Sequence, residues 1–96
     1  YSTQFAVFLN VSNSTDNRDI EIAVYEGDKM LFDETVKVTH KLSWFRQVTF
    51  NPEKTYKVYY MAFDRYNQAL VEEKKIIIDK EYFENQLPKN GVLTLS

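Results

Sequence analysis

Apolar and polar residues alternate along most of this chain. In residues 3–11, Phe5, Val7 and Leu9 stand at every second position. Successive side chains of a β-strand point to opposite faces, so this segment is expected to be a strand with one buried face. Comparable segments follow at residues 20–25, 30–39, 42–50, 56–64, 69–78 and 92–95. Residues 56–64 differ from the other segments because they are apolar on both faces, which is typical of a central or covered strand.

Two charged residues interrupt the apolar phase. Glu34 stands where residues 30–39 would continue their buried face, and it predicts a kink or a change of sheet near that point. Arg46 interrupts the apolar face of residues 42–50 in the same way.

One segment has no alternation. In residues 79–86, Asp79 is suited to cap a single helical turn that carries Tyr82 and Phe83 and ends before Pro88. Polar turns such as the one around Gly27 separate the other segments.

These elements predict an all-β fold. Short strands joined by polar turns are typical of an antiparallel two-sheet sandwich, here of about seven strands with one short helical turn near residues 80–86. The chain has 96 residues, which is the usual size of one domain, so residues 1–96 are expected to form a single domain.

The segment Phe50-Asn51-Pro52-Glu53-Lys54-Thr55-Tyr56 has an apolar residue, a proline two positions later and a tyrosine four positions after that. It resembles the tyrosine corner of fibronectin type III and related immunoglobulin-like sandwiches. The resemblance implies that the chain crosses between sheets there, that the Tyr56 hydroxyl ties the crossing backbone, and that Trp44 fills the interior. Residues 10–25 also resemble immunoglobulin-like modules of microbial surface proteins, in which an Asn-rich loop joins two strands.

Charge and composition exclude several classes of protein. Twelve basic residues stand against 14 acidic ones, which leaves a net charge of −2 and argues against a nucleic-acid partner. No apolar run approaches the ~20 residues of a membrane span, so membrane insertion is not expected. Cysteine is absent, which excludes disulfides, thiol nucleophiles and cysteine zinc sites.

Catalytic groups are sparse. His40 is the only histidine, and Ser43 near it lacks the glycines of a nucleophile elbow. Adjacent residues of a strand point to opposite faces, so neither Asp33-Glu34 nor Glu72-Glu73 can flank one substrate bond. We therefore expect a protein that is not an enzyme and that carries no cofactor.

A metal site is not expected either. Residues 16–19 offer several oxygen ligands, with Asp28 or Asp64 as further candidates for a calcium site. Aspartate and asparagine in loops are more commonly turn formers. The sequons at Asn10 and Asn13 leave glycosylation open.

The chain is rich in aromatic residues, which make up 16% of it. A core of this size absorbs part of them, but several apolar residues fall on the outer faces of the expected strands. Three explanations stay open. The outer residues pack beneath residues 79–90, they meet a neighbouring domain or protomer, or they form a platform for a sugar or peptide.

The expected function is a non-catalytic protein-interaction or structural spacer module of an extracellular or cell-surface protein. Binding would use an aromatic sheet face or a sheet edge, and the partner would be another protein, a neighbouring domain or a second copy. The alternative is a carbohydrate-binding accessory module that uses exposed rings. The residues expected to form the interaction surface are Phe45, Tyr59, Met61, Phe63, Tyr25 and Phe8.

Overall fold

The computed structural model describes residues 3–10, 17–38 and 43–95. These residues form strands β1 (Gln4–Asn10), β2 (Arg18–Glu26), β3 (Lys29–Lys37), β4 (Ser43–Thr49), β5 (Tyr56–Asp64), β6 (Leu70–Ile78) and β7 (Val92–Leu95), and helix α1 (Lys80–Asn85) between β6 and β7. The bounds of β5 and β7 are the predicted ones, and the others differ from the predictions by one or two residues at most ends.

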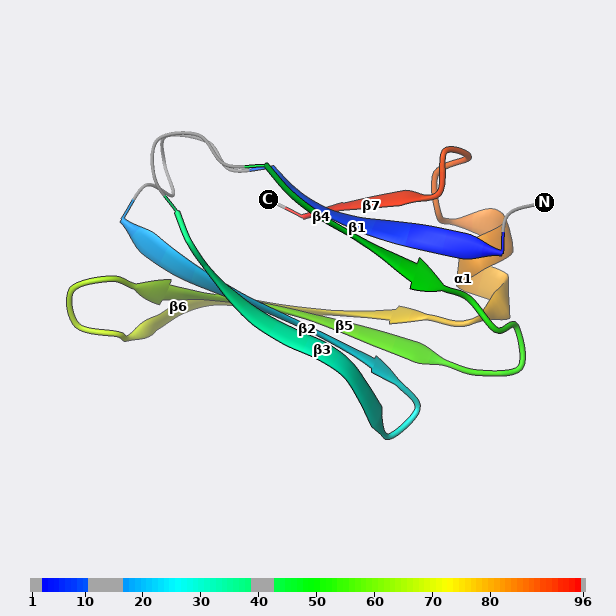
Figure 1. The fold of residues 1–96 in the computed structure, drawn as a ribbon, viewed down its shortest axis with the longest axis horizontal. Coiled ribbons are helices and arrows are strands. Elements are labelled where there is room, and N and C mark those ends of the chain that lie inside the picture. The colour runs from blue at the N-terminus through cyan, green and yellow to red at the C-terminus, as the bar shows by residue number, and fades with distance from the viewer. Residues whose placement is uncertain (1–2, 11–16, 39–42, 96) are drawn as a thin grey trace.

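Two sheets face each other (Figure 1). One has the strand order β4-β1-β7 and the other β3-β2-β5-β6. The four-stranded sheet is antiparallel throughout, whereas β1 pairs antiparallel with β4 and parallel with β7. The predicted all-β two-sheet sandwich with one short helix is therefore confirmed, except that one of its strand pairs is parallel.

The core consists of the apolar faces that the alternation predicts. Phe5, Val7 and Leu9 of β1 are buried against Ile20, Ile22 and Val24 of β2, together with the inner residues of β5. Trp44 is only 7% exposed and belongs to the same cluster, as the tyrosine-corner resemblance implied. Each sheet thus buries one face, and the outer face of each remains at the surface.

The chain crosses from the three-stranded to the four-stranded sheet just before Tyr56. The Tyr56 hydroxyl accepts a hydrogen bond from the backbone N–H of Asn51 (2.9 Å) and donates one to Oε2 of Glu26 (2.6 Å). The implied tie between Tyr56 and the crossing backbone is confirmed, and the second bond extends it to β2. Burial raises the pKa of Tyr56, and the bond to Glu26 acts in the same direction.

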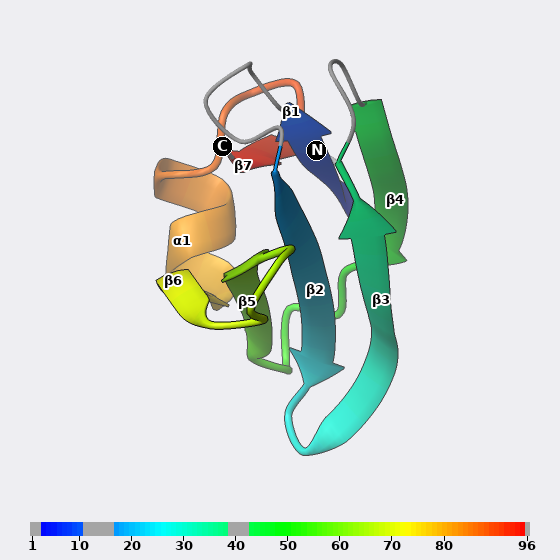
Figure 2. The ribbon, with the colours of Figure 1, turned by 90° about the vertical axis from the view of Figure 1, so that its left-hand side faces the viewer.

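Helix α1 begins as expected. The Asp79 side chain accepts a hydrogen bond from the backbone N–H of Tyr82 (2.8 Å), which satisfies a donor of the first turn. The ring of Phe83 stacks on Phe50, with 4.1 Å between the centroids and 4° between the planes. The helix thus adds to the core beside β6 and β7 (Figure 2). One explanation for the outer aromatic residues is that residues 79–90 cover them, and this is wrong for Phe83, whose ring lies in the core.

Glu34 and Arg46, the two charged residues that interrupt the apolar faces, form an ion pair with each other. β3 and β4 are edge strands of opposite sheets, and Arg46 donates from Nε to Oε2 of Glu34 (2.8 Å) and from its second amino group to Oε1 (2.7 Å). Trp44 Nε1 also donates to Oε1 (3.4 Å). β3 stays paired with β2 on both sides of Glu34, so the expected change of sheet is wrong, and the irregularity that β3 does have is a register shift at Leu31. The charged groups of Glu34 and Arg46 both point toward the opposite sheet, where they form an ion pair across the gap between the sheets.

The Glu34–Arg46 bridge should stabilise the fold in a pH-dependent way. The bonds from Arg46 lower the pKa of Glu34 below its ordinary 4.5, so the contribution is present above that value and lost as the pH falls through the folded-state pKa. A double-mutant cycle with Glu34→Gln and Arg46→Gln should give a coupling of about 0.5–1 kcal/mol at pH 7, because the pair is partly exposed. Urea unfolding followed by Trp44 fluorescence and circular dichroism measures it, and a coupling that persists unchanged to pH 2.5 would contradict this role.

Removing the hydroxyl group should change the stability differently at the two buried tyrosines Tyr56 and Tyr60. Tyr56→Phe leaves the Asn51 N–H and the Glu26 carboxylate without their partner, and should lower the free energy of unfolding by about 1–3 kcal/mol. The Tyr60 hydroxyl is buried, and no described residue bonds to it, so Tyr60→Phe should leave stability unchanged or raise it. Denaturant unfolding of both variants compares them, and equal losses would refute the assignment of the Tyr56 hydroxyl as a tie.

Candidate interaction surface

The outer face of the four-stranded sheet gathers four of the residues expected at the interaction surface. Tyr59, Met61 and Phe63 alternate along β5 with its core residues, and Tyr25 lies on the neighbouring β2. All four are half-buried, because neighbouring side chains of the sheet shield their flanks while nothing described covers them from above. The two-sided apolar character of β5 thus has two different causes, with the core on one face and this surface on the other.

Two tyrosine rings stand at right angles in the middle of this face. The centroids of Tyr25 and Tyr59 are 5.7 Å apart and their planes meet at 85°. Lysines flank both rings: the Lys57 ammonium is 5.9 Å from the Tyr25 centroid, and that of Lys75 is 5.7 Å from the Tyr59 centroid. Each lysine lies on the strand next to its ring, so its apolar stem adds to the shielding while its charge stays near solvent.

A depression of about 240 Å³ opens beside the rings. It is lined by Tyr25, Tyr59 and Met61 and by the carboxylates of Glu21 and Asp33. Ala23 forms part of the lining and is nearly buried, and its short side chain leaves the space that a larger residue would fill. The hollow therefore combines apolar walls with two acidic groups.

The two carboxyl groups repel each other when both are ionised. Asp33 lies opposite Ala23 across the β2–β3 ladder, which places it diagonally to Glu21 on the same face. A hydrogen bond from the protonated Glu21 carboxyl to Asp33 raises the pKa of Glu21 above its ordinary 4.5, and desolvation and the charge of Asp33 add to the shift. The pair is thus set to accept a cation or a hydrogen-bond donor.

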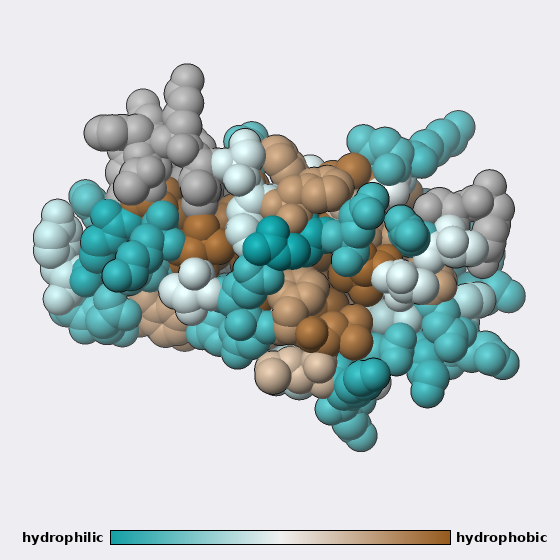
Figure 3. Space-filling model, in the orientation of Figure 1, coloured by the Kyte–Doolittle hydropathy of each residue, from teal (hydrophilic) through white to brown (hydrophobic). Residues whose placement is uncertain are grey.

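The remaining two expected residues lie elsewhere. Phe8 and Phe45 are directly opposite each other across β1 and β4, on the outer face of the three-stranded sheet, where Phe45 is 46% exposed. The two outer faces point away from each other, so the six residues cannot form one contact surface. Figure 3 views the molecule from the side of β3 and β4, where apolar residues reach the surface as separate patches between polar ones.

Sequence reasoning missed the polar part of this surface. Glu21, Asp33, Lys57 and Lys75 all lie on outward positions of strands that the alternation predicts correctly. The feature of the sequence that could have revealed the pair of Glu21 and Asp33 is the hairpin turn at Gly27. The register of this hairpin brings the two residues together although 12 positions separate them in the sequence. Comparing charges along the chain only, as in Asp33-Glu34, could not find this pair.

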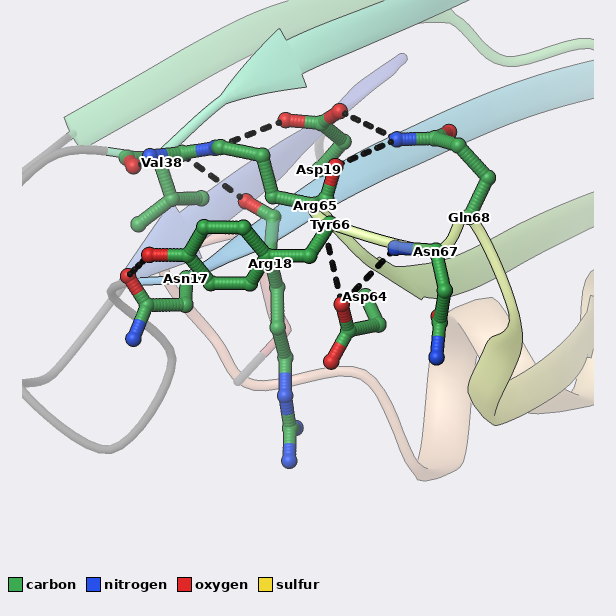
Figure 4. Close-up of polar contacts among 9 residues, drawn as sticks. All are labelled: Asn17, Arg18, Asp19, Val38, Asp64, Arg65, Tyr66, Asn67 and Gln68. Carbon is green, nitrogen blue, oxygen red and sulfur yellow. Dashed lines mark hydrogen bonds and ion pairs between the residues drawn. The ribbon is translucent and has the colours of Figure 1, made fainter.

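The alternative calcium site is not assembled. The Asp19 carboxylate is held by Arg65 Nε (3.4 Å) and by the Gln68 side-chain amide (3.3 Å), as Figure 4 shows. Asp64 accepts from backbone N–H groups of its own turn, and Asp28 lies at the opposite end of β2. Asp16 lies outside the described residues. Within the described part of the chain, no group of three or more histidine or acidic residues is placed to hold a metal ion.

The residues considered for catalysis are also dispersed, as far as the structure describes them. His40 and the sequon residue Asn13 lie outside the described residues. Asp33 and Glu34 point to opposite faces of β3, because Asp33 lines the outer hollow and Glu34 bonds to Arg46. Ser43 is exposed at the start of β4.

Comparison with known protein families, with curated proteins and with solved structures gives no match. In the described ranges of the chain, no helix has the length and apolar character that a membrane span requires.

Replacing Glu21 should stabilise the protein at neutral pH. A raised pKa in the folded state means that the folded state binds more protons than the unfolded state above pH 4.5, so stability falls as the pH rises through that window. Glu21→Gln should therefore raise the melting temperature at pH 7, and the gain should shrink as the pH is lowered below 4.5. Glu53→Gln, in an exposed turn, is the control. Thermal melts at pH 3, 5 and 7 test this, and a gain of the same size at all three would contradict it.

Proposed function

We propose that this chain is a non-catalytic protein-interaction or structural spacer module of an extracellular or cell-surface protein, with an immunoglobulin- or fibronectin-like sandwich. It binds another protein or a neighbouring domain through the outer face of its four-stranded sheet. The observation that carries the proposal is the hollow beside the crossed rings of Tyr25 and Tyr59, with Met61 and two carboxylates around it.

Composition supports a protein partner for this face. Tyrosine and methionine are enriched at protein interfaces, where a ring supplies a large contact area at small entropic cost. The half-buried rings of Tyr25 and Tyr59 are held by each other and by lysines, so little ordering remains to be done on binding. The partner that suits the hollow presents an apolar group for the rings and a donor, such as a lysine or arginine side chain, for Glu21 and Asp33.

Two observations support the family and the compartment. The bond from the Asn51 N–H to the Tyr56 hydroxyl has the arrangement of a tyrosine corner, in which a tyrosine bonds to backbone a few residues upstream. Asn10, the acceptor of one sequon, is exposed at the end of β1, and an acceptor must be exposed to be glycosylated.

The alternative, a carbohydrate-binding accessory module, draws on the same rings with less support. Stacking on the face of a sugar favours rings that lie open and in one plane, whereas Tyr25 and Tyr59 meet at 85° and lysines lie over both. The carboxylates in the hollow are the feature that favours it, because they accept hydrogen bonds from sugar hydroxyls.

Tyr59→Ser should remove binding without unfolding the domain. Peptides selected on the immobilised wild-type domain from a displayed random library serve as the probe. Those that bind the outer face should lose at least about tenfold in affinity for Tyr59→Ser, because a central aromatic anchor is worth about 2 kcal/mol or more. Tyr66→Ser is the matched control, since Tyr66 is 81% exposed in the β5–β6 turn and should bind the peptides normally.

Three other results would contradict this prediction or redirect it. If the selected peptides bind Tyr59→Ser and the wild type alike, the outer face is not the binding surface. If Tyr59→Ser unfolds the domain by circular dichroism, the ring belongs to the folded framework, and Met61→Ser replaces it as the test. Binding of soluble oligosaccharides that Tyr59→Ser abolishes, without any peptide binding, would favour the alternative.

A further inference from the structure

β6 is the outermost strand of the four-stranded sheet, on the side away from β3 (Figure 2). An edge strand presents unpaired backbone N–H and C=O groups, which can pair with the edge of another sheet. Three of the exposed large apolar side chains belong to β6: Leu70 (49% exposed), Val71 (48%) and Ile77 (49%). Apolar residues on such an edge favour association unless charges prevent it.

None of the charged residues of β6 lies directly opposite an opposite charge on its neighbour β5. The register places Glu73 opposite Met61 and Lys75 opposite Tyr59 on the outer face. On the inner face, Lys74 is opposite Tyr60, and its ammonium lies 3.6 Å from the carboxylate of Glu72 two residues away. The acidic and basic residues of the outer face thus have their complement along β6 and not across the ladder.

We propose that β6 pairs antiparallel with β6 of a second copy of this chain, about a two-fold axis at Lys74. A two-fold axis perpendicular to the sheet pairs residues that lie equally far from it on either side, so Glu73 faces Lys75 of the other copy and Lys75 faces Glu73. Further out, the apolar residues Leu70 and Val71, where the β5–β6 register shifts, lie toward Ile77 of the other copy. The charged residues of the outer face, Glu73 and Lys75, then each face an opposite charge, which is the kind of pair that stabilises sheets.

The inner face tolerates the same register. Lys74 faces its own copy, but Glu72, which is also 3.9 Å from Arg18, is close to its own Lys74 and lies diagonally across from the second lysine. Moving the axis to Glu73 would bring two glutamates face to face on the outer surface and leave Lys75 without an opposite charge across the pair. The register centred on Lys74 is therefore the favoured one.

The other edge of the same sheet has the opposite property. In β3, acidic Asp33 is at the centre and Lys29 and Lys37 are at the two ends. Pairing two copies of β3 about its centre would bring Asp33 onto Asp33, and the register shift at Leu31 turns Lys29 to the inner face, so Lys29 does not offset this repulsion on the outer face. The charge order of β3 resists self-association and that of β6 permits it, which makes the dimer specific to one edge.

A charge swap tests the pairing. Lys75→Glu and Glu73→Lys each turn two attractive pairs into repulsive ones, and each should weaken the dimer by about tenfold or more. The double variant Glu73→Lys/Lys75→Glu restores opposite charges and should restore the dimer. Lys57→Glu is the matched control, because Lys57 is also an outer lysine beside a tyrosine ring but lies on β5. Sedimentation equilibrium over a wide concentration range measures the dissociation constants.

A single cysteine tests the position of the axis. The chain has no cysteine, and Lys74→Cys would face its own copy at a separation that a disulfide can bridge. Mild oxidation should therefore link this variant into a covalent dimer, and Lys29→Cys on β3 should stay uncoupled. A monomer at all concentrations, a dimer that survives both single charge reversals, or equal coupling of the two cysteine variants would overturn the proposal. Loss of peptide binding by Tyr59→Ser is a separate result, so either proposal can fail alone.

Discussion

The passage of the chain between the two sheets, and the packing of Tyr56 at that point, hold the sandwich together. The Tyr56 ring lies 5.7 Å from Phe5 of β1 and 5.3 Å from Phe50, and Phe50 in turn stacks on Phe83 of α1. Its hydroxyl reaches the crossing backbone at Asn51 and the end of β2 at Glu26. One side chain therefore links both sheets, the crossing and, through Phe50, the helix. Because so many elements meet there, the relative position of the sheets depends on it.

With the sheets fixed at the crossing, the two long sides of the sandwich are closed by different means. On the side of β3 and β4, Arg46 and Glu34 bridge the gap over Trp44, and the ring of Phe32 packs against Trp44 at 5.9 Å. On the side of β6 and β7, Phe83 of helix α1 and Leu87, which follows the helix, insert into the core. Since the helix is used to fill the core, it does not lie over the outer face of β5, and the rings of Tyr25 and Tyr59 stay at the surface. The outer face of the four-stranded sheet is therefore exposed because the helix fills the core on the side of β6 and β7.

The sequence predicts what depends on neighbours along the chain. Alternation gives the strands, in the case of β5 with both ends correct, and Asp79 gives the start of the helix, because strand faces and helix caps are local properties. Apart from hairpins such as the one at Gly27, it does not predict which strands pair, so the parallel β1–β7 pair and the contact of Glu34 with Arg46 could not be foreseen. Seen along the chain, Glu34 breaks a pattern. Seen across the gap between the sheets, it completes an ion pair, and long-range partners of this kind carry no signal in a single sequence.

The same distinction bears on the candidate surface. Its aromatic residues are recognisable from alternation, whereas Glu21 and Asp33 become a pair only through the register of the β2–β3 hairpin. The core-facing charges Glu34 and Arg46 are matched, yet the outer pair of like charges raises the pKa of Glu21 and costs stability at neutral pH. Substitution of either carboxylate would relieve that cost, so folding alone gives no reason to keep both. A binding partner that places a donor or a cation between them does give a reason, because it turns the repulsion into affinity.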